Sequence, residues 1–339
     1  MNGLCVVGQK DAAFAQQIAL ALGVPLHQLL SDYFADSESY VEFNGEADIA
    51  GQTILFVYQF TQVYQGLDQN SGICINHQLF CLLQAIRKLA LYKPAKIITV
   101  LPYLPYARQE RPHVAADESP FSFLLRLLRF AGADEIITTD LHGFSNNLVQ
   151  YDRLIHISLD QWWVLFLQEI LGQEQFTGEA CIVSPDAGGM ARAHHVAALL
   201  NVDVASIQKI RQQKDQAVAI GMIGDVRGKV AVILDDIIDT GRTAIQACEL
   251  LRRNGARRVI GCFSHAVLSS GALERLSSCA FDAVFISDTL IVDGCRYPAN
   301  VQFVPLQKYF VEKIVEITKS MNGLDTWTVS TTQRLFEQL

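Results

Sequence analysis

Short apolar runs alternate with amphipathic stretches along almost the whole chain, and this alternation limits the folds that the chain can adopt. Runs such as KIITVL (96–101) and VAVIL (230–234) are typical of strands that are buried on both faces of a sheet. Patterns of helical spacing lie between such runs, as in residues 75–92 and 243–256. The alternation predicts an α/β fold with mostly parallel sheets flanked by helices. Such sheets bind ligands at the carboxyl ends of their strands.

The expected elements fall into two series. Strands are expected at residues 4–7, 54–60, 96–101, 135–140, 181–184, 202–207, 230–236, 259–265, 283–288 and 301–306. Helices are expected at residues 11–23, 75–92, 121–133, 189–201 and 243–256. The order of elements before about residue 155 resembles the order after it. We therefore predict two similar α/β domains, residues 1–155 and 156–320, followed by a polar C-terminal tail of residues 321–339.

Composition narrows the class of protein. A chain of 339 residues is long enough for two domains with hydrophobic cores, and 50% hydrophobic with 18% charged residues is typical of globular proteins. The net charge of −8 argues against a surface that binds nucleic acid non-specifically. The first residues lack the pattern of a signal peptide, and no apolar run approaches the roughly 20 residues of a membrane span. We expect a cytoplasmic protein without a nucleic-acid or membrane partner.

The eight cysteines point to the same compartment. No two of them have CxxC spacing, and several stand inside apolar runs such as ACIVS and VIGCFSH. Buried free thiols in a reducing environment are therefore expected, rather than disulfides or a zinc site.

The stretch VAVILDDIIDTGRT, residues 230–243, places carboxylates at the mouth of an expected buried strand. They are Asp235, Asp236 and Asp239. Carboxylates there need a cation, hydroxyl groups or backbone donors, because water reaches them poorly. The residues that follow stand where a helix begins, and they are Thr240, Gly241, Arg242 and Thr243. Unpaired N–H groups and the helix dipole favour a phosphate at such a place. Ribose phosphate fits the combination; the alternative is a capped helix with solvated acidic residues.

Other candidate residues also follow expected strands. Arg108, Gln109 and Arg111 lie in a loop that Pro102 and Pro105 make rigid. Guanidinium groups there would grip a polyphosphate or stack on adenine, and the alternative is a solvated surface loop.

A histidine, an aspartate and two cations complete the candidate residues. His142 and Asp186 follow strands; a lone histidine is more often structural, whereas Asp186 suits either Mg²⁺ or a helix N-cap. Lys209 and Arg211 lie in a polar stretch, where cations are usually only solvated. The sequence lacks GxxxxGK[ST], so no P-loop would hold ATP.

Several stretches resemble known motifs. VILDDIIDTGRT (232–243) resembles the phosphoribosyl-pyrophosphate motif that type I phosphoribosyltransferases share with ribose-phosphate pyrophosphokinases. LPYLPYARQERPH, TTDLH, IVSPDAGGMARA, FADSES and SHAVLSSGALERL resemble further segments of the pyrophosphokinases alone. The matches run in order from about residue 34 to residue 290. On these motifs the chain is identified as a member of the ribose-phosphate pyrophosphokinase family, with the type I phosphoribosyltransferase fold.

The resemblance implies a reaction and a set of roles. The reaction is transfer of the β,γ-diphosphoryl group of ATP to O1 of ribose 5-phosphate, which yields AMP and phosphoribosyl pyrophosphate. The resemblance implies ATP binding by Phe34, Asp36, Glu38, Arg108, Gln109 and Arg111, ribose 5-phosphate binding by Asp235, Asp236, Asp239, Thr240, Gly241, Arg242 and Thr243, Mg²⁺ binding by His142 and Asp186, and catalysis by Lys209 and Arg211. It also implies a homo-oligomer built from dimers, of which a hexamer is one form.

The chain departs from the family pattern at two of these places. Ser37 stands where the family has glycine, and Arg242 stands where it has a small residue. Two alternatives stay open. A phosphoribosyltransferase would have no role for the PYARQ and DLH segments. A non-catalytic homologue that co-assembles with a true synthase would not need Lys209, Arg211, His142 and Asp186.

Overall fold

The computed structural model describes residues 3–10, 12–36, 38–43, 49–63, 74–111, 118–143, 153–172, 179–210, 219–269, 271–293 and 296–321. These residues form two seven-stranded sheets and one two-stranded sheet. The first sheet has the order β3 (Ser39–Phe43), β2 (Leu26–Tyr33), β1 (Leu4–Gln9), β4 (Thr53–Val57), β6 (Lys96–Leu101), β7 (Glu135–Thr139) and β8 (Leu154–Ile157). The second has the order β11 (Ala219–Ile223), β10 (Asp203–Ile210), β9 (Ala180–Ser184), β12 (Val230–Ile238), β13 (Arg258–Ala266), β14 (Ala283–Ser287) and β16 (Val301–Val304).

The two large sheets share one topology. In each, the strand order reverses around the first strand, and only the hairpin at one edge, β2–β3 or β10–β11, is antiparallel. The described helices are α1 (Ala13–Leu22), α2 (Ile75–Leu91), α3 (Pro120–Ala131), α4 (Asp160–Leu171), α5 (Met190–Leu200), α6 (Arg242–Arg253), α7 (Ala272–Ser277) and α8 (Gln307–Met321), with a 3₁₀ turn η1 at Ala107–Gln109. The predicted fold class, two similar α/β units with mostly parallel sheets, is confirmed.

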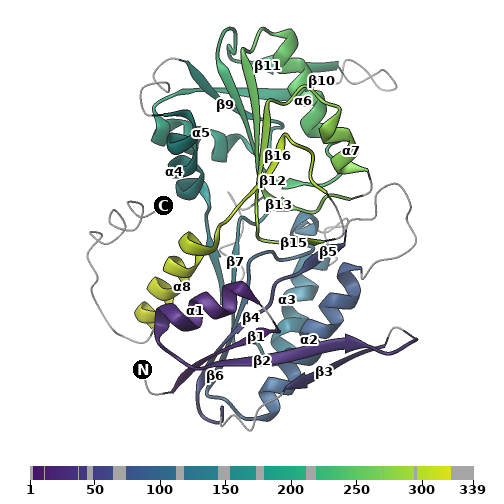
Figure 1. Ribbon diagram of the computed structural model, residues 1–339, viewed down its shortest axis with the longest axis vertical. Coiled ribbons are helices and arrows are strands. Elements are labelled where there is room, and N and C mark those ends of the chain that lie inside the picture. The colour runs from purple at the N-terminus through teal and green to yellow at the C-terminus, as the bar shows by residue number, and fades with distance from the viewer. Residues whose placement is uncertain are drawn as a thin grey trace.

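Helices cover both faces of each large sheet (Figure 1). On the first sheet, alternate strand residues point to opposite layers, as the pleat requires. Val6 and Val100 pack in the cluster with α1 and α8, whereas Val7 and Leu101 pack in the cluster with α2 and α3. This two-sided burial explains why the strands are continuous apolar runs in the sequence.

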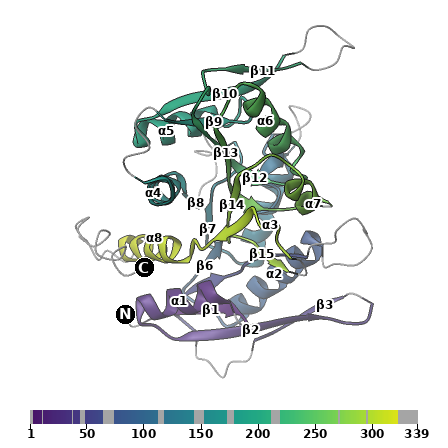
Figure 2. The ribbon, with the colours of Figure 1, turned by 45° about the horizontal axis from the view of Figure 1, so that its top comes forward.

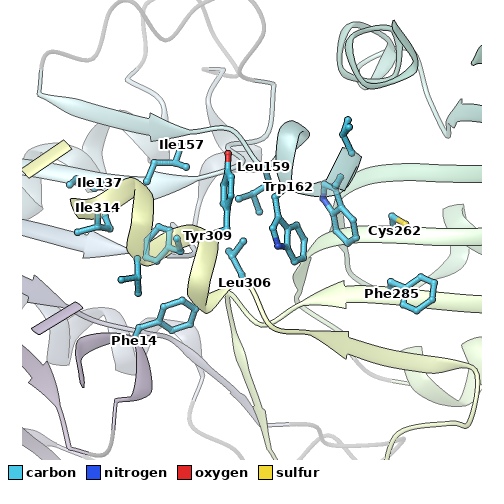
Figure 3. Close-up of a cluster of buried hydrophobic side chains, with 14 of the residues drawn as sticks. Phe14, Ile137, Ile157, Leu159, Trp162, Cys262, Phe285, Leu306, Tyr309 and Ile314 are labelled. Carbon is cyan, nitrogen blue, oxygen red and sulfur yellow. The ribbon is translucent and has the colours of Figure 1, made fainter. Parts of the chain in front are cut away.

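Helix α8 and strand β15 (Ile291–Asp293) tie the later half of the chain to the earlier one. Phe310 of α8 meets Phe14 of α1 edge to face, with ring centroids 5.4 Å apart. Leu306, Tyr309 and Ile314 lie in the same buried cluster (Figure 3). Strand β15 pairs in parallel with β5 (Thr61–Val63). The predicted boundaries at residues 155 and 320 stay a prediction, and the unit 156–320 includes a helix that packs on the first sheet.

The thiols agree with the expectation from the sequence. Of the seven described cysteines, all free, five are buried: Cys5, Cys81, Cys181, Cys248 and Cys262. Among the described helices, none is both long enough and apolar enough to cross a membrane.

Candidate active site

A cavity of about 820 Å³ lies between the two large sheets. Its walls come from the loops after β6 and β7 and from β8 in the first sheet, and from the loop after β9 and the later part of β12 in the second, joined by the starts of α4 and α5. In each case the chain leaves the carboxyl end of a parallel strand, which is the edge where α/β sheets bind ligands. Parts of these sequence motifs therefore share one cavity, but Asp239 and residues 240–243 are not among the described residues that line it.

The loop after β6 carries Arg108 to the second sheet. Tyr106 has a left-handed φ of 65°, and its hydroxyl donates to Asn76 Oδ1 over 2.8 Å. Arg108 then donates from Nη1 to Asp239 Oδ2 at 2.7 Å. Burial alone would raise the pKa of Asp239, but the hydrogen bonds from Ser269 and Arg108 lower it below its ordinary value. The predicted ATP-binding arginine thus meets the predicted sugar-binding carboxylate.

His142, in the loop after β7, makes a second contact between the sheets. Its Nδ1 lies 2.8 Å from Asp236 Oδ2, and this hydrogen bond raises the pKa of His142 above its ordinary value. Burial alone would raise the pKa of Asp236, but His142 outweighs it and holds that pKa well below its usual range. Nδ1–H therefore donates to an ionised carboxylate, which leaves Nε2 available to a ligand.

Asp235 has a different electrostatic environment from its neighbour. Burial, followed by the adjacent charge of Asp236, raises the pKa of Asp235 well above its ordinary value. The backbone N–H of Asp236 donates to Asp235 Oδ1 over 2.9 Å. The surroundings thus shift the pKa values of the two neighbouring carboxyl groups in opposite directions.

Asp186 follows β9 and has an exposed side chain. Its Oδ1 accepts hydrogen bonds from the N–H groups of Gly188 and Gly189, at 2.8 and 3.0 Å. A Cβ at Gly189 would lie 2.7 Å from Ser184 Oγ, so this tight turn has no room for a side chain. The alternative that Asp186 is a helix N-cap is wrong, because the N-cap of α5 is Gly189 and Asp186 closes the turn before it. Only Oδ1 accepts these two hydrogen bonds, which leaves Oδ2 for a ligand.

The segment from Thr240 to Thr243 forms the start of α6. Gly241 has a φ of 74°, a left-handed conformation that favours glycine, and the helix begins at Arg242. Arg275 of α7 donates from Nε to the carbonyl oxygen of Thr240 over 2.8 Å, and this hydrogen bond stabilises the turn. Arg242 and Thr243 are exposed. The helix thus starts where the sequence predicted, and phosphate binding at this place stays a prediction.

Comparisons with known proteins agree with this geometry. A model of the N-terminal domain of ribose phosphate pyrophosphokinase matches residues 4–132, and a phosphoribosyl transferase domain model matches residues 166–283. A ribose-phosphate pyrophosphokinase of Thermotoga maritima is 30% identical over 318 residues, which cover 93% of this chain and 95% of the relative. One of Aquifex aeolicus is 31% identical over 334 residues, 96% of this chain and all of the relative (100%).

The chain belongs to the ribose-phosphate pyrophosphokinase family. The crystal structure of a phosphoribosylpyrophosphate synthetase from Mycobacterium smegmatis has the same fold, with a TM-score of 0.77 at 28% identity. The match covers 94% of this chain and 100% of that one.

Not every residue that the family motifs suggested lies at the cavity. Phe34, Asp36 and Glu38 lie at the turn between β2 and β3, at the outer end of the hairpin (Figure 2). Phe34 is 58% exposed and packs against Tyr40, with centroids 4.8 Å apart. They are not among the described residues that line the cavity. Ser37, Arg211 and the side chain of Lys209 lie outside the described part of the chain.

The sequence did not single out several residues that do line the cavity. They are Glu110, Asp140, His156, Ser158, Asp160, Arg192 and His195. Asp140 and Arg192 stand inside the family motifs TTDLH and GGMARA, so their position in those motifs was a usable signal. His156 lies in β8 and Asp160 follows it, and β8 is a short and only partly buried strand that the apolar pattern does not reveal.

The buried ring of His156 is expected to make the free energy of unfolding depend on pH. Burial lowers the pKa of His156 from 6.5 to about 4, and its Nε2 accepts the N–H of Leu141 at 3.3 Å. Between pH 6.5 and about pH 4, His156 binds a proton in the unfolded chain but not in the folded chain. The free energy of unfolding should therefore fall from about pH 6.5 to about pH 4, by up to about 3 kcal/mol from this group.

Urea unfolding across this range, on wild type and His156→Gln, would measure the effect. Glutamine keeps an acceptor for the Leu141 N–H but does not titrate there. The variant should lose less stability than wild type between pH 6.5 and 4. Two parallel curves would show that His156 does not carry the acid sensitivity.

Proposed function

We propose that the chain transfers the β,γ-diphosphoryl group of ATP to O1 of ribose 5-phosphate, with AMP and phosphoribosyl pyrophosphate as products. The observation that carries the proposal is the meeting of two half-sites, one on each sheet. Arg108 and His142, from motifs specific to the pyrophosphokinases, contact Asp239 and Asp236 of the sugar motif. A phosphoribosyltransferase has no use for the first of these half-sites.

Ribose 5-phosphate would occupy the loop after β12. The N–H groups at the start of α6 would receive the 5-phosphate, with the hydroxyls of Thr240 and Thr243 and the guanidinium of Arg242 beside them. The carboxyl groups of Asp235, Asp236 and Asp239 would bind the ring hydroxyls, because they end the strand just before that turn. The anomeric oxygen would then point into the shared cavity, toward the first sheet.

ATP would bind to the loops of the first sheet. Arg108, Gln109 and Arg111 are all exposed and line the cavity, so phosphates or adenine could reach them. Binding would exchange the Arg108–Asp239 contact for contacts to the two substrates. Phe34, Asp36 and Glu38 lie too far along the β2–β3 hairpin to join this site, so we assign them to the ATP site of another copy in a dimer-based homo-oligomer.

The donor atoms of His142 and Asp186 fit a magnesium ion that is shared with substrate phosphates. Their unused atoms are one ring nitrogen and one carboxylate oxygen, and Mg²⁺ typically takes few protein ligands together with phosphate oxygens and water. Among the described residues, no group of three or more His, Cys, Asp or Glu residues is placed to hold a metal by itself. A bound Mg²⁺ would neutralise charge on the transferring phosphates. The protein's own part is to align the two substrates in line and to exclude water.

Incubation of the protein with MgATP and ribose 5-phosphate, followed by phosphorus NMR, tests the proposal. AMP and phosphoribosyl pyrophosphate in equal amounts are the expected result. If neither appeared while calorimetry showed that both substrates bind, a non-catalytic homologue that regulates a true synthase would replace the proposal.

The buried free thiols agree with activity in a reducing cytoplasm.

Arg242 offers a test of the sugar half-site alone. Replacing it with glycine, a small residue as in the family pattern, should raise KM for ribose 5-phosphate about tenfold with little change in kcat, because a hydrogen bond to a charged group contributes about 1.5–3 kcal/mol. Arg253→Ala, on the same helix but at its far end and paired with Glu249, is the matched control. An unchanged or lower KM in the Arg242 variant would mean that this side chain crowds the phosphate.

A further inference from the structure

Asp140, which follows β7 at the rim of the cavity, has an unusual backbone conformation and an unusual environment. Its φ is +33°, in the left-handed region that costs a non-glycine residue on the order of 1 kcal/mol. Its side chain is only 4% exposed. Both features persist in a folded protein only where the surrounding structure holds the residue firmly.

The groups that hold Asp140 come from later parts of the chain. The backbone N–H of Leu159 donates to Oδ1 over 2.9 Å, while Ser264 of β13 and Arg192 of α5 both donate to Oδ2. The carbonyl oxygen of Asp140 accepts from His265 Nε2 at 3.1 Å. Burial lowers the pKa of His265 below its ordinary value, and its Nδ1 lies 2.8 Å from Thr289 Oγ1. Both the side chain and the backbone of Asp140 are thus anchored to the second sheet and its helices.

Arg192 is itself fixed by more than one partner. Its Nε lies 3.0 Å from Asp160 Oδ1, at the start of α4, and its Nη2 donates to Ser264 Oγ over 3.2 Å. Trp163 Nε1 donates to the same hydroxyl over 3.2 Å. The guanidinium is mostly buried between two carboxylates, and loss of the Asp140 charge would leave it paired with Asp160 alone.

This network lies next to the contact that joins the two half-sites. His142 comes two residues after Asp140. The imidazole is 44% exposed, and the only hydrogen bond found for it among the described residues is the one to Asp236. The position of the imidazole therefore depends on the contact with Asp236 and on the course of the backbone from Asp140 to His142.

We propose that Asp140 and Arg192 are positioning residues. They hold the loop of His142 at a fixed distance from Asp236, and so fix how the ATP-binding loops of the first sheet lie relative to the ribose 5-phosphate loop of the second. Neither residue needs to touch a substrate for this role. The kinetic consequence rests on the proposed function, whereas the consequence for the geometry of His142 does not.

Asp140→Asn tests the inference, because asparagine keeps the size of the side chain but removes the charge that faces Arg192. The first readout is the imidazole ¹⁵N and ¹H spectrum of substrate-free protein labelled in its eight histidines, with the His142 signals assigned through His142→Gln. The second is kinetics, with kcat and the Kd of ribose 5-phosphate measured separately. Arg252→Met is the matched control: it breaks an Arg–Asp pair, with Asp282, at the end of α6 that faces away from the cavity.

In Asp140→Asn, the His142 signals should move toward those of an unpaired imidazole, and kcat should fall by about 10²-fold, as for a misplaced group. The Kd of ribose 5-phosphate should stay close to wild type, because its loop lies in the second sheet. The control should lose stability without either change. Ser264→Ala removes one hydrogen bond to the carboxylate and should give smaller shifts if Asp140→Asn does not fold. His142 signals that stay at their wild-type positions in both variants would overturn the inference, whether or not the wild type is active.

Discussion

Replacing Lys209 with alanine is expected to lower kcat by about 10²–10³-fold while the Kd of ribose 5-phosphate stays unchanged. Lys209 stands next to the last residue of β10, the strand beside β9, whose end carries Asp186. Together with Arg211 it is the pair to which the family resemblance assigns catalysis. A cation that acts on developing charge affects the transition state more than the ground state.

Single-turnover formation of AMP and calorimetric titration of ribose 5-phosphate would separate the two effects. Lys229→Ala is the matched control, since Lys229 pairs with Asp203 and precedes β12, at the end of the sheet away from the cavity. The control should keep its kcat. A Lys209 variant that lost substrate affinity and kcat to the same extent would have lost a general binding contact instead.

Phe310→Ala is expected to reduce the free energy of unfolding by about 3–5 kcal/mol, the range for a large aromatic side chain removed from a core. Phe310 is fully buried (0% exposed) between α8 and α1, in the cluster that joins the two halves. Phe130→Ala, at an 88% exposed position on α3, is the matched control and should stay within about 0.5 kcal/mol of wild type. Urea unfolding followed by tryptophan fluorescence would measure both. A loss for Phe310 no larger than that for Phe130 would show that α8 does not support the core.

The central strands and the helices after them were predictable because of their surroundings. Strands β1, β4, β6, β9 and β12 are buried on both faces and so contain almost only apolar residues. Strands β2 and β8 lie at or near a sheet edge and have mixed burial, so neither a continuous apolar run nor strict alternation marks them. The sequence analysis placed a domain boundary at residue 155, within β8, because the order of the expected elements is similar before and after it.

For the site, the sequence predicted which loops contribute residues but not which residues bond to each other. The motifs of Arg108, His142 and Asp239 were visible, but nothing in their spacing says that Arg108 bonds to Asp239 or that His142 bonds to Asp236. Those contacts depend on how the two sheets face each other. Asp140 looked like part of a short motif, and its role emerges only from Arg192 and Ser264, which lie far along the chain.

The return of α8 to α1 has a consequence for how the chain folds as it is synthesised. Leu4, Ala15 and Ile18 belong to a cluster whose covering helix, residues 307–321, is synthesised about 300 residues after them. Until then all strands of the first sheet can pair, but one of its apolar faces lacks the helix that covers it. Nascent chains that stop before residue 307 should expose that surface and bind chaperones or aggregate, whereas the full chain buries it in one final step.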